Sequence, residues 1–363
     1  MTEPYRAHSK STSFADSKFQ TADSKPQTTV AKTMEPVVEP EARQSTEKID
    51  ISVVIRAYNA EKTLPAILDK LKSQTGTDEF LWEVVVVDNN STDTTAQIVR
   101  DYQASWQRPY PLKYFLELQQ GAAVARKRAV VESSGELIGF LDDDNFPHER
   151  WVAEIYAFSK SYPQAGVFGS RIEGKFEIEP PKDFQKIQGF LAIKEYGDRP
   201  RRFNADLLDL PAGAGMVVRK QVWLDNIPKK PQLQGPVGKS LAEKGEDFES
   251  MIHISRAGWE IWYNPEMRLY HQIPAWRLEK DYLLNLVRCS GLNVCTLRCI
   301  RAKSWRKPII AARIVAGSLK KSIGHYIHHR GQFEENIVAS CQMEFFRSSL
   351  VSPFYYLKRI KLL

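Results

Sequence analysis

The sequence predicts an α/β protein with a doubly wound, mostly parallel sheet and a C-terminal helical extension. From Ile51 onward, short apolar runs rich in β-branched residues alternate with amphipathic helical patterns. This alternation favours parallel strands joined by right-handed helical crossovers. Beyond about residue 275 the short apolar runs stop, and mixed helical periodicity continues to the end of the chain.

Composition divides the chain into three parts. Its 363 residues are 42% hydrophobic and 26% charged, which is ordinary for a globular protein and enough for one large core or two smaller ones. Residues 1–48 are rich in Ser, Thr, Lys, Gln and Pro, so too little apolar surface is present to offset the entropy of ordering. We expect a disordered segment over 1–48, a folded α/β domain over 49–275 and a basic amphipathic helical region over 276–363.

The elements of the middle part follow from periodicity and turn residues. Residues 168–210, rich in Pro, Gly and charge, predict a long irregular connection. Strands are predicted over 51–55, 82–87, 112–116, 136–141, 211–218, 259–263 and 267–270, with His271 ending the last. Helices are predicted over 61–72, after Asp93 to about 102, over 122–132, from about 148 and from 245.

The C-terminal part is strongly basic. Residues 275–363 hold sixteen Lys and Arg against five Asp and Glu, a net charge of +11 within a chain of net +7. Helical patterns cover 282–300 and 309–327, and residues 353–363 interleave aromatic and aliphatic side chains with cations. These segments either lie at an anionic membrane surface or pack on the α/β domain. Nucleic acid is not expected as a partner, because no recognition module accompanies the charge.

Cellular location is predicted from what the sequence lacks. No run of about 18 apolar residues occurs, and the first residues lack the apolar core of a signal peptide. The four cysteines, all C-terminal, fit no zinc spacing and are expected to be buried, reduced thiols. We therefore expect a cytoplasmic protein, peripheral on the inner face of the plasma membrane.

Three consecutive carboxylates, Asp142, Asp143 and Asp144, follow the predicted strand 136–141. Side chains alternate along an extended chain, so Asp142 and Asp144 can face one way while Asp143 faces the other. Two carboxylates on one side repel, and a divalent cation between them would remove that repulsion. The alternative is a solvated acidic turn that caps the next helix. Asn59, Asp88 and Asp142 all fall at strand ends and should line one crevice.

Five motifs in order give the chain its family resemblance. They are Val54-Ile-Arg-Ala-Tyr-Asn59, Val87-Asp-Asn-Asn-Ser-Thr-Asp93, Gly121 with Ala125-Arg126, Phe140-Leu-Asp-Asp-Asp144 and Gly245-Glu-Asp247. This set resembles family 2 glycosyltransferases of the GT-A fold and covers roughly residues 50–275. The whole chain also resembles cyanobacterial enzymes of hormogonium polysaccharide synthesis.

The resemblance implies a nucleotide site at the first strand ends. Six residues are placed there: Ala57, Tyr58, Asn59, Asp88, Arg126 and Asp143. Asp88 would accept a hydrogen bond from a uracil imide; its alternative role as a helix cap suits Ser91 and Thr92 better. Arg126 has a solvated helix face as its alternative. Trp223 and Trp276 are candidates for stacking on sugar rings, with core packing as the equal alternative.

The resemblance also implies a metal site and a base. Asp142 and Asp144 would hold the donor diphosphate through Mn²⁺ or Mg²⁺, with His271 as a third ligand. Asp247 would deprotonate the acceptor hydroxyl, with Glu246 as its catalytic neighbour. Asn145 departs from the family, which often has an acid there; this lowers local charge but removes neither carboxylate ligand.

These expectations combine into an inverting glycosyltransferase. It would move a sugar from a nucleotide-diphosphate donor, UDP-linked, to a polysaccharide or lipid-linked saccharide acceptor in cell-surface glycan synthesis. A catalytically inactive scaffold at the membrane surface is one alternative. A nucleotidylyltransferase is another, but its glycine-rich loop after the first strand is missing from Ala57-Tyr-Asn-Ala-Glu61.

Overall fold

One mixed β-sheet forms the centre of the structure. The computed structural model describes residues 48–237, 240–242, 244–300 and 302–362, so the predicted disordered segment lies outside the described residues except for Lys48. Within the described chain the strands are β1 (Ile51–Ala57), β2 (Trp82–Asp88), β3 (Leu112–Leu116), β4 (Leu137–Asp142), β5 (Asn145–Pro147), β6 (Ala165–Phe176), β7 (Arg201–Arg202), β8 (Met216–Arg219) and β9 (Glu260–Ile273).

The strand order confirms a doubly wound α/β fold and adds an antiparallel part. The sheet runs β3-β2-β1-β4-β8-β6-β9-β5, and β7 pairs with β9. β3, β2, β1 and β4 are parallel to one another, as the strand–helix alternation predicts. β8 is antiparallel to both β4 and β6, whereas β6 and β9 are parallel. The connection from β6 to β8, which follows α4 (Trp151–Ser161) and β6, contains no α-helix and so permits the first of these reversals.

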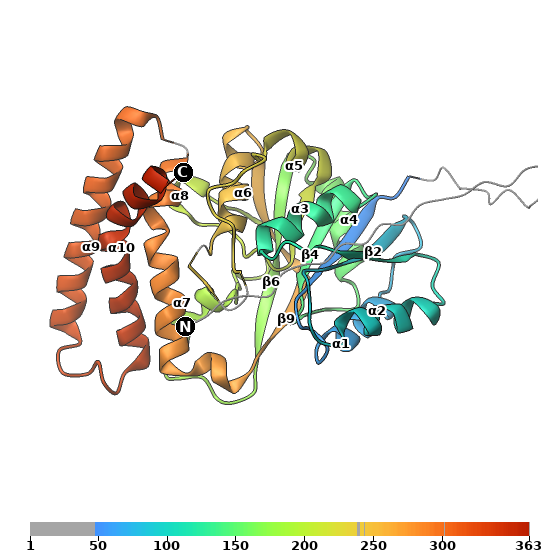
Figure 1. The fold of residues 1–363 in the computed structure, drawn as a ribbon, viewed down its shortest axis with the longest axis horizontal. Coiled ribbons are helices and arrows are strands. Elements are labelled where there is room, and N and C mark those ends of the chain that lie inside the picture. Colours follow the sequence, from blue (N-terminus) through green and yellow to red (C-terminus); the bar gives the residue numbers. More distant parts are fainter. Residues whose placement is uncertain (1–47, 238–239, 243, 301, 363) are drawn as a thin grey trace, which may run out of the picture. The chain divides into compact units, whose positions relative to one another are not determined.

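Helices cover both faces of the sheet (Figure 1). Successive residues of β1 point to opposite faces, with Val53 and Ile55 in one core and Val54 in the other. The first core packs against α1 (Leu64–Lys72), α2 (Thr95–Ala104) and α4. The second core packs against α3 (Ala122–Glu132), α5 (Lys220–Asn226) and α6 (Glu246–Arg256). Because both faces are buried, these strands read as continuous apolar runs.

Two predictions for the second half of the sheet were wrong. Residues 168–176 were expected to be irregular, yet they belong to β6. The strand is rich in glycine because neighbours approach closely: a Cβ at Gly169 would lie 2.2 Å from the Cβ of Pro211. The two short strands expected over 259–270 are one strand, β9, and His271 lies inside it. A register shift moves the pairing from Asn264 to Arg268, and that bulge interrupts the side-chain alternation.

The segment before β8 is a turn, although the sequence predicted a strand from residue 211. β8 begins only at Met216, and Gly215 has φ +64°. A side chain at Gly215 would meet Leu269 Cδ1 at 2.2 Å, so glycine is required for both conformation and space. Between β6 and β8 the chain forms three short 3₁₀ helices, η1 (Phe184–Lys186), η2 (Gln188–Leu191) and η3 (Ala205–Leu207).

The C-terminal region is helical, as expected, but its boundaries differ. It contains η4 (Ala275–Leu278), α7 (Lys280–Leu292), α8 (Val294–Ile300), η5 (Ser304–Arg306), α9 (Lys307–His328) and α10 (Ile337–Leu362). The helix expected over 282–300 breaks at the buried Asn293, whose Nδ2 donates to the carbonyls of Ala242, Lys244 and Cys289 at 3.0 Å each. The part of α10 before residue 353 was not predicted.

These helices pack on one another and on the end of β9. Val287 of α7 and Val338 of α10 share a core with Ile273 and with η2. All four cysteines are buried free thiols, which confirms that prediction. Among the described residues, none of the helices combines the length and the apolar character needed to cross a bilayer.

Candidate active site

The carboxyl ends of β1, β2 and β4 meet at one edge of the sheet. Ala57 lies opposite Asp88 in the β1–β2 register, and Arg56 lies opposite Asp142 in the β1–β4 register. This confirms that the predicted strand ends share an edge. The register also brings Arg56 to the site, a residue that the sequence reasoning missed.

The predicted nucleotide residues of β1 and β2 form one hydrogen-bonded pair of turns. Asn59, with φ +53°, accepts a bond from Thr92 N through Oδ1 at 2.8 Å. Asp88 accepts from Ser91 N and from the Tyr114 hydroxyl, both at 2.9 Å. Ala57 is buried and Tyr58 is 37% exposed. Four predicted residues therefore lie together at this edge, where hydrogen bonds within the protein hold Asn59 and Asp88 in place.

The helix cap proposed as the alternative for Asp88 is made by another residue. Asp93 Oδ1 accepts from Thr95 N at 3.0 Å and from its hydroxyl at 2.6 Å. Asp93 Oδ2 accepts from Glu61 N at 3.1 Å. Ser91 and Thr92 were expected to cap α2 and do not, because the helix begins later, at Thr95.

A cavity of about 520 Å³ lies beside this edge. One wall carries ionisable side chains: Arg56, Arg126, Asp142, Asp144, Lys194, Lys244, Glu246, Asp247, His271 and Arg277. The other wall is largely apolar and comes from η2, the segment before α6 and the C-terminal helices: Phe190, Leu241, Tyr282, Leu286, Leu297 and Phe345. The turn residues Ala57, Tyr58, Asn59 and Asp88 are not among the described residues that line this cavity.

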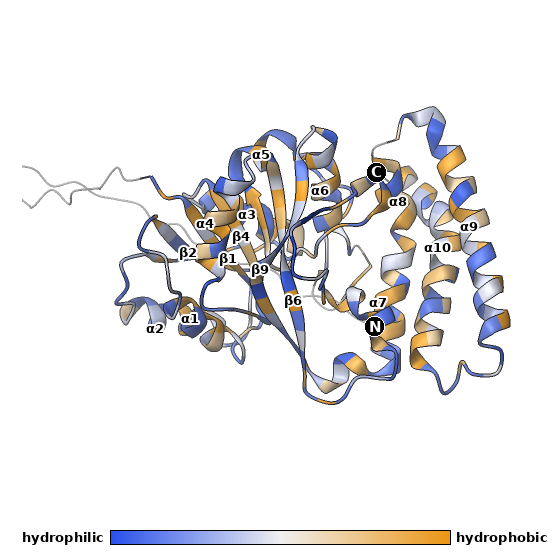
Figure 2. Cartoon of the chain, turned by 180° about the vertical axis from the view of Figure 1, so that it is seen from behind, coloured by the Kyte–Doolittle hydropathy of each residue, from blue (hydrophilic) through white to orange (hydrophobic). Residues whose placement is uncertain are grey.

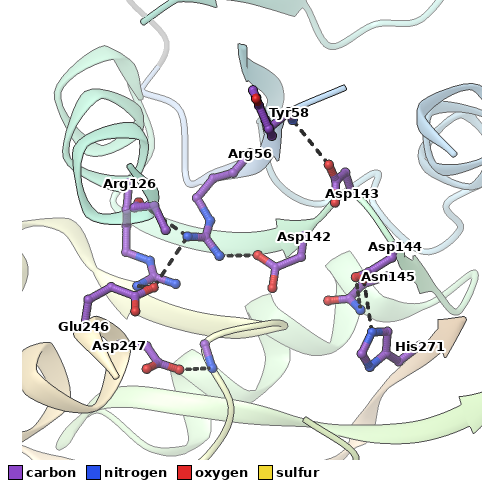
Figure 3. Close-up of polar contacts among 12 residues, drawn as sticks. Arg56, Tyr58, Arg126, Asp142, Asp143, Asp144, Asn145, Glu246, Asp247 and His271 are labelled. Carbon is purple, nitrogen blue, oxygen red and sulfur yellow. Dashed lines mark hydrogen bonds and ion pairs between the residues drawn. The ribbon is translucent and has the colours of Figure 1, made fainter. Parts of the chain in front are cut away.

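A chain of ion pairs runs along the polar wall (Figure 3). Arg56 pairs with Asp142 through Nη2, and its Nη1 lies 3.8 Å from Glu246 Oε1. Arg126 Nη1 lies 3.3 Å from the same Glu246 oxygen. Arg126 is 1% exposed, so the alternative of a solvated helix face is wrong. Burial, followed by the charge of Asp247, raises the pKa of Glu246, while both arginines lower it.

Asp144 has different partners. Its Oδ2 lies 3.2 Å from His271 Nε2 and 2.8 Å from Arg277 Nη1. Desolvation raises the pKa of Asp144, but His271 and Arg277 outweigh it and hold the pKa well below the usual range. We expected a cation between Asp142 and Asp144 because it would remove their repulsion. In the structure each carboxylate has an arginine partner of its own, so repulsion alone does not call for a cation there.

Alternation along the triplet is as predicted. Asp142 and Asp144 line the cavity, whereas Asp143 accepts a bond from Tyr58 N at 3.2 Å, outside it (Figure 3). Burial and the neighbouring Asp144 charge raise the pKa of Asp143 to about 7. Asp143 thus joins the turn after β1 to the end of β4.

His271 and Asp144 fit a divalent cation that is shared with a substrate. His271 Nδ1 contacts the carbonyl of Leu191 at 2.8 Å, which leaves Nε2 facing Asp144, as in many metal-ligating histidines. Within the described residues, no three His, Cys, Asp or Glu side chains gather closely enough to hold an ion by themselves. Two protein ligands completed by phosphate and water oxygens are common for Mg²⁺. Asp142 stands apart, paired with Arg56.

Asp247 lies in the first turn of α6, after Gly245 at φ +114°. Its Oδ2 accepts from Gly213 N at 2.8 Å and its Oδ1 from Phe248 N at 2.8 Å. A carboxylate offers about four lone-pair directions, so two remain for a substrate hydroxyl. The two backbone bonds fix the carboxylate while it faces the cavity.

Several cations of the cavity were not anticipated. Lys194 and Lys244 both line it, and burial lowers the pKa of each. Lys244 Nζ donates to the Phe190 carbonyl at 3.0 Å. The sequence held one usable signal, Arg56, because a charged residue inside a buried strand calls for a partner. Lys194, Lys244 and Arg277 lie in segments whose sequence shows no helical or strand periodicity, so the direction of their side chains could not be predicted.

The two tryptophans have different surroundings. Trp223 is 6% exposed, and its ring centroid lies 5.8 Å from that of Phe140. The alternative role in core packing is therefore confirmed for Trp223. Trp276 is 50% exposed and meets Tyr282 edge to face at 4.9 Å. Only Trp276 of this pair has an open ring face.

The sequence of residues 52–222 matches the family model described as glycosyl transferase family 2. The match covers a little under half of the chain and shows a family 2 glycosyltransferase domain over these residues, and the fold is the GT-A fold. The family match favours a glycosyltransferase over the nucleotidylyltransferase alternative. The narrower resemblance to hormogonium polysaccharide enzymes stays a prediction.

Curated relatives match over a limited stretch. The glycosyltransferase AglE of Haloferax volcanii is 36% identical over 103 residues, 28% of this chain and 33% of that protein. The dolichyl-phosphate beta-glucosyltransferase ALG5A of Trichomonas vaginalis is 34% identical over 152 residues, 39% of this chain and 45% of that protein. The chain therefore spans a third to less than half of the length of these two relatives.

A solved structure shows the same fold. It is the mannosyltransferase PcManGT of Pyrobaculum calidifontis, in complex with GDP-Man and Mn²⁺. The superposition covers 85% of this chain and 88% of that one, with a TM-score of 0.54 and 16% identity. At this identity the likeness establishes the shared fold alone.

Proposed function

We propose that this protein is an inverting, metal-dependent glycosyltransferase that uses a UDP-linked sugar and a lipid-linked or polysaccharide acceptor. The observation that carries the proposal is the polar wall of the cavity. There Asp144 and His271 lie at the end of the sheet, and Asp247 is fixed by two backbone bonds. A donor diphosphate needs a cation, which Asp144 and His271 would hold. An acceptor hydroxyl needs a base, which Asp247 would provide.

The nucleotide would bind at the turns after β1 and β2, beside Ala57, Tyr58, Asn59 and Asp88. Asp88 is already anchored by Ser91 N and Tyr114, and each carboxylate oxygen keeps a lone pair for a uracil imide. Asp143 would fix the position of Tyr58. Arg56 and Arg126, which Glu246 holds in place, would bring positive charge to the diphosphate. We therefore give Glu246 a positioning role.

A divalent cation, Mn²⁺ or Mg²⁺, would be held by Asp144 and His271, with Asp142 nearby. When bound, it supplies Lewis-acid stabilisation to the departing phosphate. Arg277 Nη1 contacts both of these ligand atoms, Asp144 Oδ2 at 2.8 Å and His271 Nε2 at 2.9 Å. Arg277 would turn toward the diphosphate as the donor enters, since both ligands must be released to the ion.

The transfer itself is one displacement at the anomeric carbon. Asp247 takes the proton of the acceptor hydroxyl as its oxygen bonds to that carbon. The bond from the anomeric carbon to the diphosphate oxygen breaks, and the nucleoside diphosphate leaves with the electron pair. A single in-line attack inverts the configuration.

The acceptor proposal has support from the second wall of the cavity. Phe190, Leu286 and Phe345 offer apolar contacts close to the half-buried cation Lys244. An apolar surface beside a cation suits a lipid phosphate. The name of the relative ALG5A, a dolichyl-phosphate enzyme, points to the same class.

The substitution Asp247→Asn tests the catalytic assignment. We expect kcat to fall at least a thousandfold while calorimetry shows donor binding within about threefold of wild type, because the base acts on the acceptor. Asp225→Asn, on α5 outside the cavity, is the matched control. Loss of donor binding together with turnover would show that Asp247 belongs to the nucleotide site or to the fold.

A further inference from the structure

Helix α9 carries an apolar stripe that no other part of the described chain covers. Six of its small or apolar residues are exposed, at alternating spacings of three and four: Ile309, Ala312, Ala316, Leu319, Ile323 and Tyr326. Ile323 and Tyr326 are 52% and 51% exposed, and Trp305, just before the helix, is 65% exposed. This spacing places the residues along one face of a helix. Figure 2 shows hydrophobic segments along α9, the outermost helix of this region.

The opposite face of α9 packs against the protein. Ile314 and Ser318 are each 8% exposed, and Ile314 shares a small core with Cys295, Cys299 and Tyr356. The exposed stripe is therefore not the face by which α9 is attached. Its residues are free to meet another surface while the helix keeps its place.

Charge identifies the partner. Residues Lys307–His328 contain four Lys and Arg and no Asp or Glu. Helical geometry places Arg313 and Lys320 along one border of the stripe. A second copy docked through the same stripe would bring its own Arg313 and Lys320 against these, and α9 offers no carboxylate to pair with them. An anionic lipid surface supplies negative charge for the border and an apolar interior for the stripe.

We propose that α9, with Trp305, is a membrane-docking helix that lies in the plane of an anionic lipid surface. Among the described residues, no helix could cross the bilayer, so the contact is interfacial. α10 packs against both α9 and α7, and Phe345 of α10 and Leu286 of α7 line the active cavity (Figure 1). If α9 docks, α10 and then α7 are the next helices from the lipid surface, and both carry residues of the apolar wall of the cavity.

This proposal moves the expected membrane contact away from the last residues of the chain. The sequence favoured 353–363, but Tyr356 of that segment is 6% exposed and its hydroxyl accepts from Lys307 Nζ at 3.0 Å. Phe354, 71% exposed, is an outer residue of a packed helix. The docking proposal uses none of the residues assigned to catalysis. An experiment can therefore contradict the docking proposal or the proposed function without contradicting the other.

Liposome co-sedimentation of the full chain tests the proposal. Vesicles of phosphatidylcholine with about 30% phosphatidylglycerol should retain the protein at low salt, and vesicles of phosphatidylcholine alone should not. The double variant Leu319→Ser with Ile323→Ser should lower the apparent partition coefficient about tenfold or more. The pair Arg313→Gln with Lys320→Gln should do the same and flatten the salt dependence.

Matched controls separate docking from general effects. Ile178→Ser with Leu207→Ser changes two apolar residues that are 50% and 67% exposed elsewhere, and Lys229→Gln with Lys230→Gln removes two exposed cations outside α9. Both control pairs should bind vesicles like wild type, and all variants should keep the wild-type Tm. Equal binding of the α9 variants and wild type would overturn the proposal. So would a dimer in light scattering that Ile323→Ser dissociates, since α9 would then be a protein interface.

Discussion

Gly213 lies directly beneath the carboxylate of Asp247 and donates to it. A Cβ at Gly213 would meet Asp247 Oδ2 at 2.7 Å and Arg126 Nη2 at 2.8 Å. Gly213→Ala should therefore displace the base by part of an ångström and lower kcat about 10- to 100-fold, since small misplacements of catalytic groups are costly. Donor affinity, measured by calorimetry, should fall by a smaller factor than kcat, through the displacement of Arg126 alone.

The matched control for this prediction is Gly317→Ala on the exposed side of α9, where the added Cβ meets nothing within 4 Å. Its kcat should equal that of wild type. An unchanged kcat in Gly213→Ala would show that the position of Asp247 tolerates movement, which contradicts its role as the base.

At the residue scale the sequence predicted the acids of the site but not their partners. Asp142, Asp144 and Asp247 could be found because carboxylates at strand ends and helix starts stand in recognisable patterns. Arg277 could not, since its contact with Asp144 depends on where η4 leaves β9. Nor could the contact of Arg126 with Glu246, because the two residues come from helices on separate segments.

At the element scale, Asp93 holds the start of α2 and the turn before α1 together. Its carboxylate accepts from Thr95 N, the Thr95 hydroxyl and Glu61 N. Asp93→Ala should lower the free energy of unfolding by about 1–2 kcal/mol, the usual effect of removing such a cap. Asp101→Ala, an exposed acid in the last turn of the same helix, should change it by less than about 0.5 kcal/mol.

The effect of Asp93→Ala should depend on pH. Desolvation raises the pKa of Asp93, but the bonds from Thr95 outweigh it, and the pKa in the folded protein is lowered. The stabilisation is therefore complete above the unfolded pKa of about 3.9 and disappears as pH falls through the folded value. Urea unfolding of both proteins at pH 7 and near pH 3 measures this difference; an equal difference at the two pH values would contradict the ionic cap.

Elements with clear periodicity matched the structure, and elements under tertiary constraint did not. The helix predicted over 122–132 is α3 with the same bounds, because its pattern and Gly121 mark both ends. β6 was missed because Gly166, Gly169 and Gly174 lower its strand propensity; each is required by a neighbour within 3 Å of its would-be Cβ. Such contacts join distant parts of the chain and leave no local signal.

At the scale of the whole molecule, the helices beyond residue 275 complete the catalytic cavity. Phe345 of α10 and Leu297 of α8 face the polar wall on which Asp144 and Asp247 lie. The sequence left this region as either packing on the domain or a membrane contact. In the structure α7, α8 and α10 line the cavity, and α9 presents the exposed stripe for which we propose the membrane contact. The boundary at residue 275 stays a prediction.

We propose that the protein transfers a sugar from a nucleotide donor bound at this cavity, with a divalent cation at Asp144. The most direct measurement is release of nucleoside diphosphate from a panel of nucleotide sugars, with Mn²⁺, with excess chelator, and in Asp144→Asn. We expect release of nucleoside diphosphate from a UDP-sugar, and excess chelator should abolish it. Asp144→Asn should lower this release at least a hundredfold while its Tm stays that of wild type. Release that persists in chelator and in Asp144→Asn, or no release from any donor with Mn²⁺ and acceptor lipid present, would contradict it.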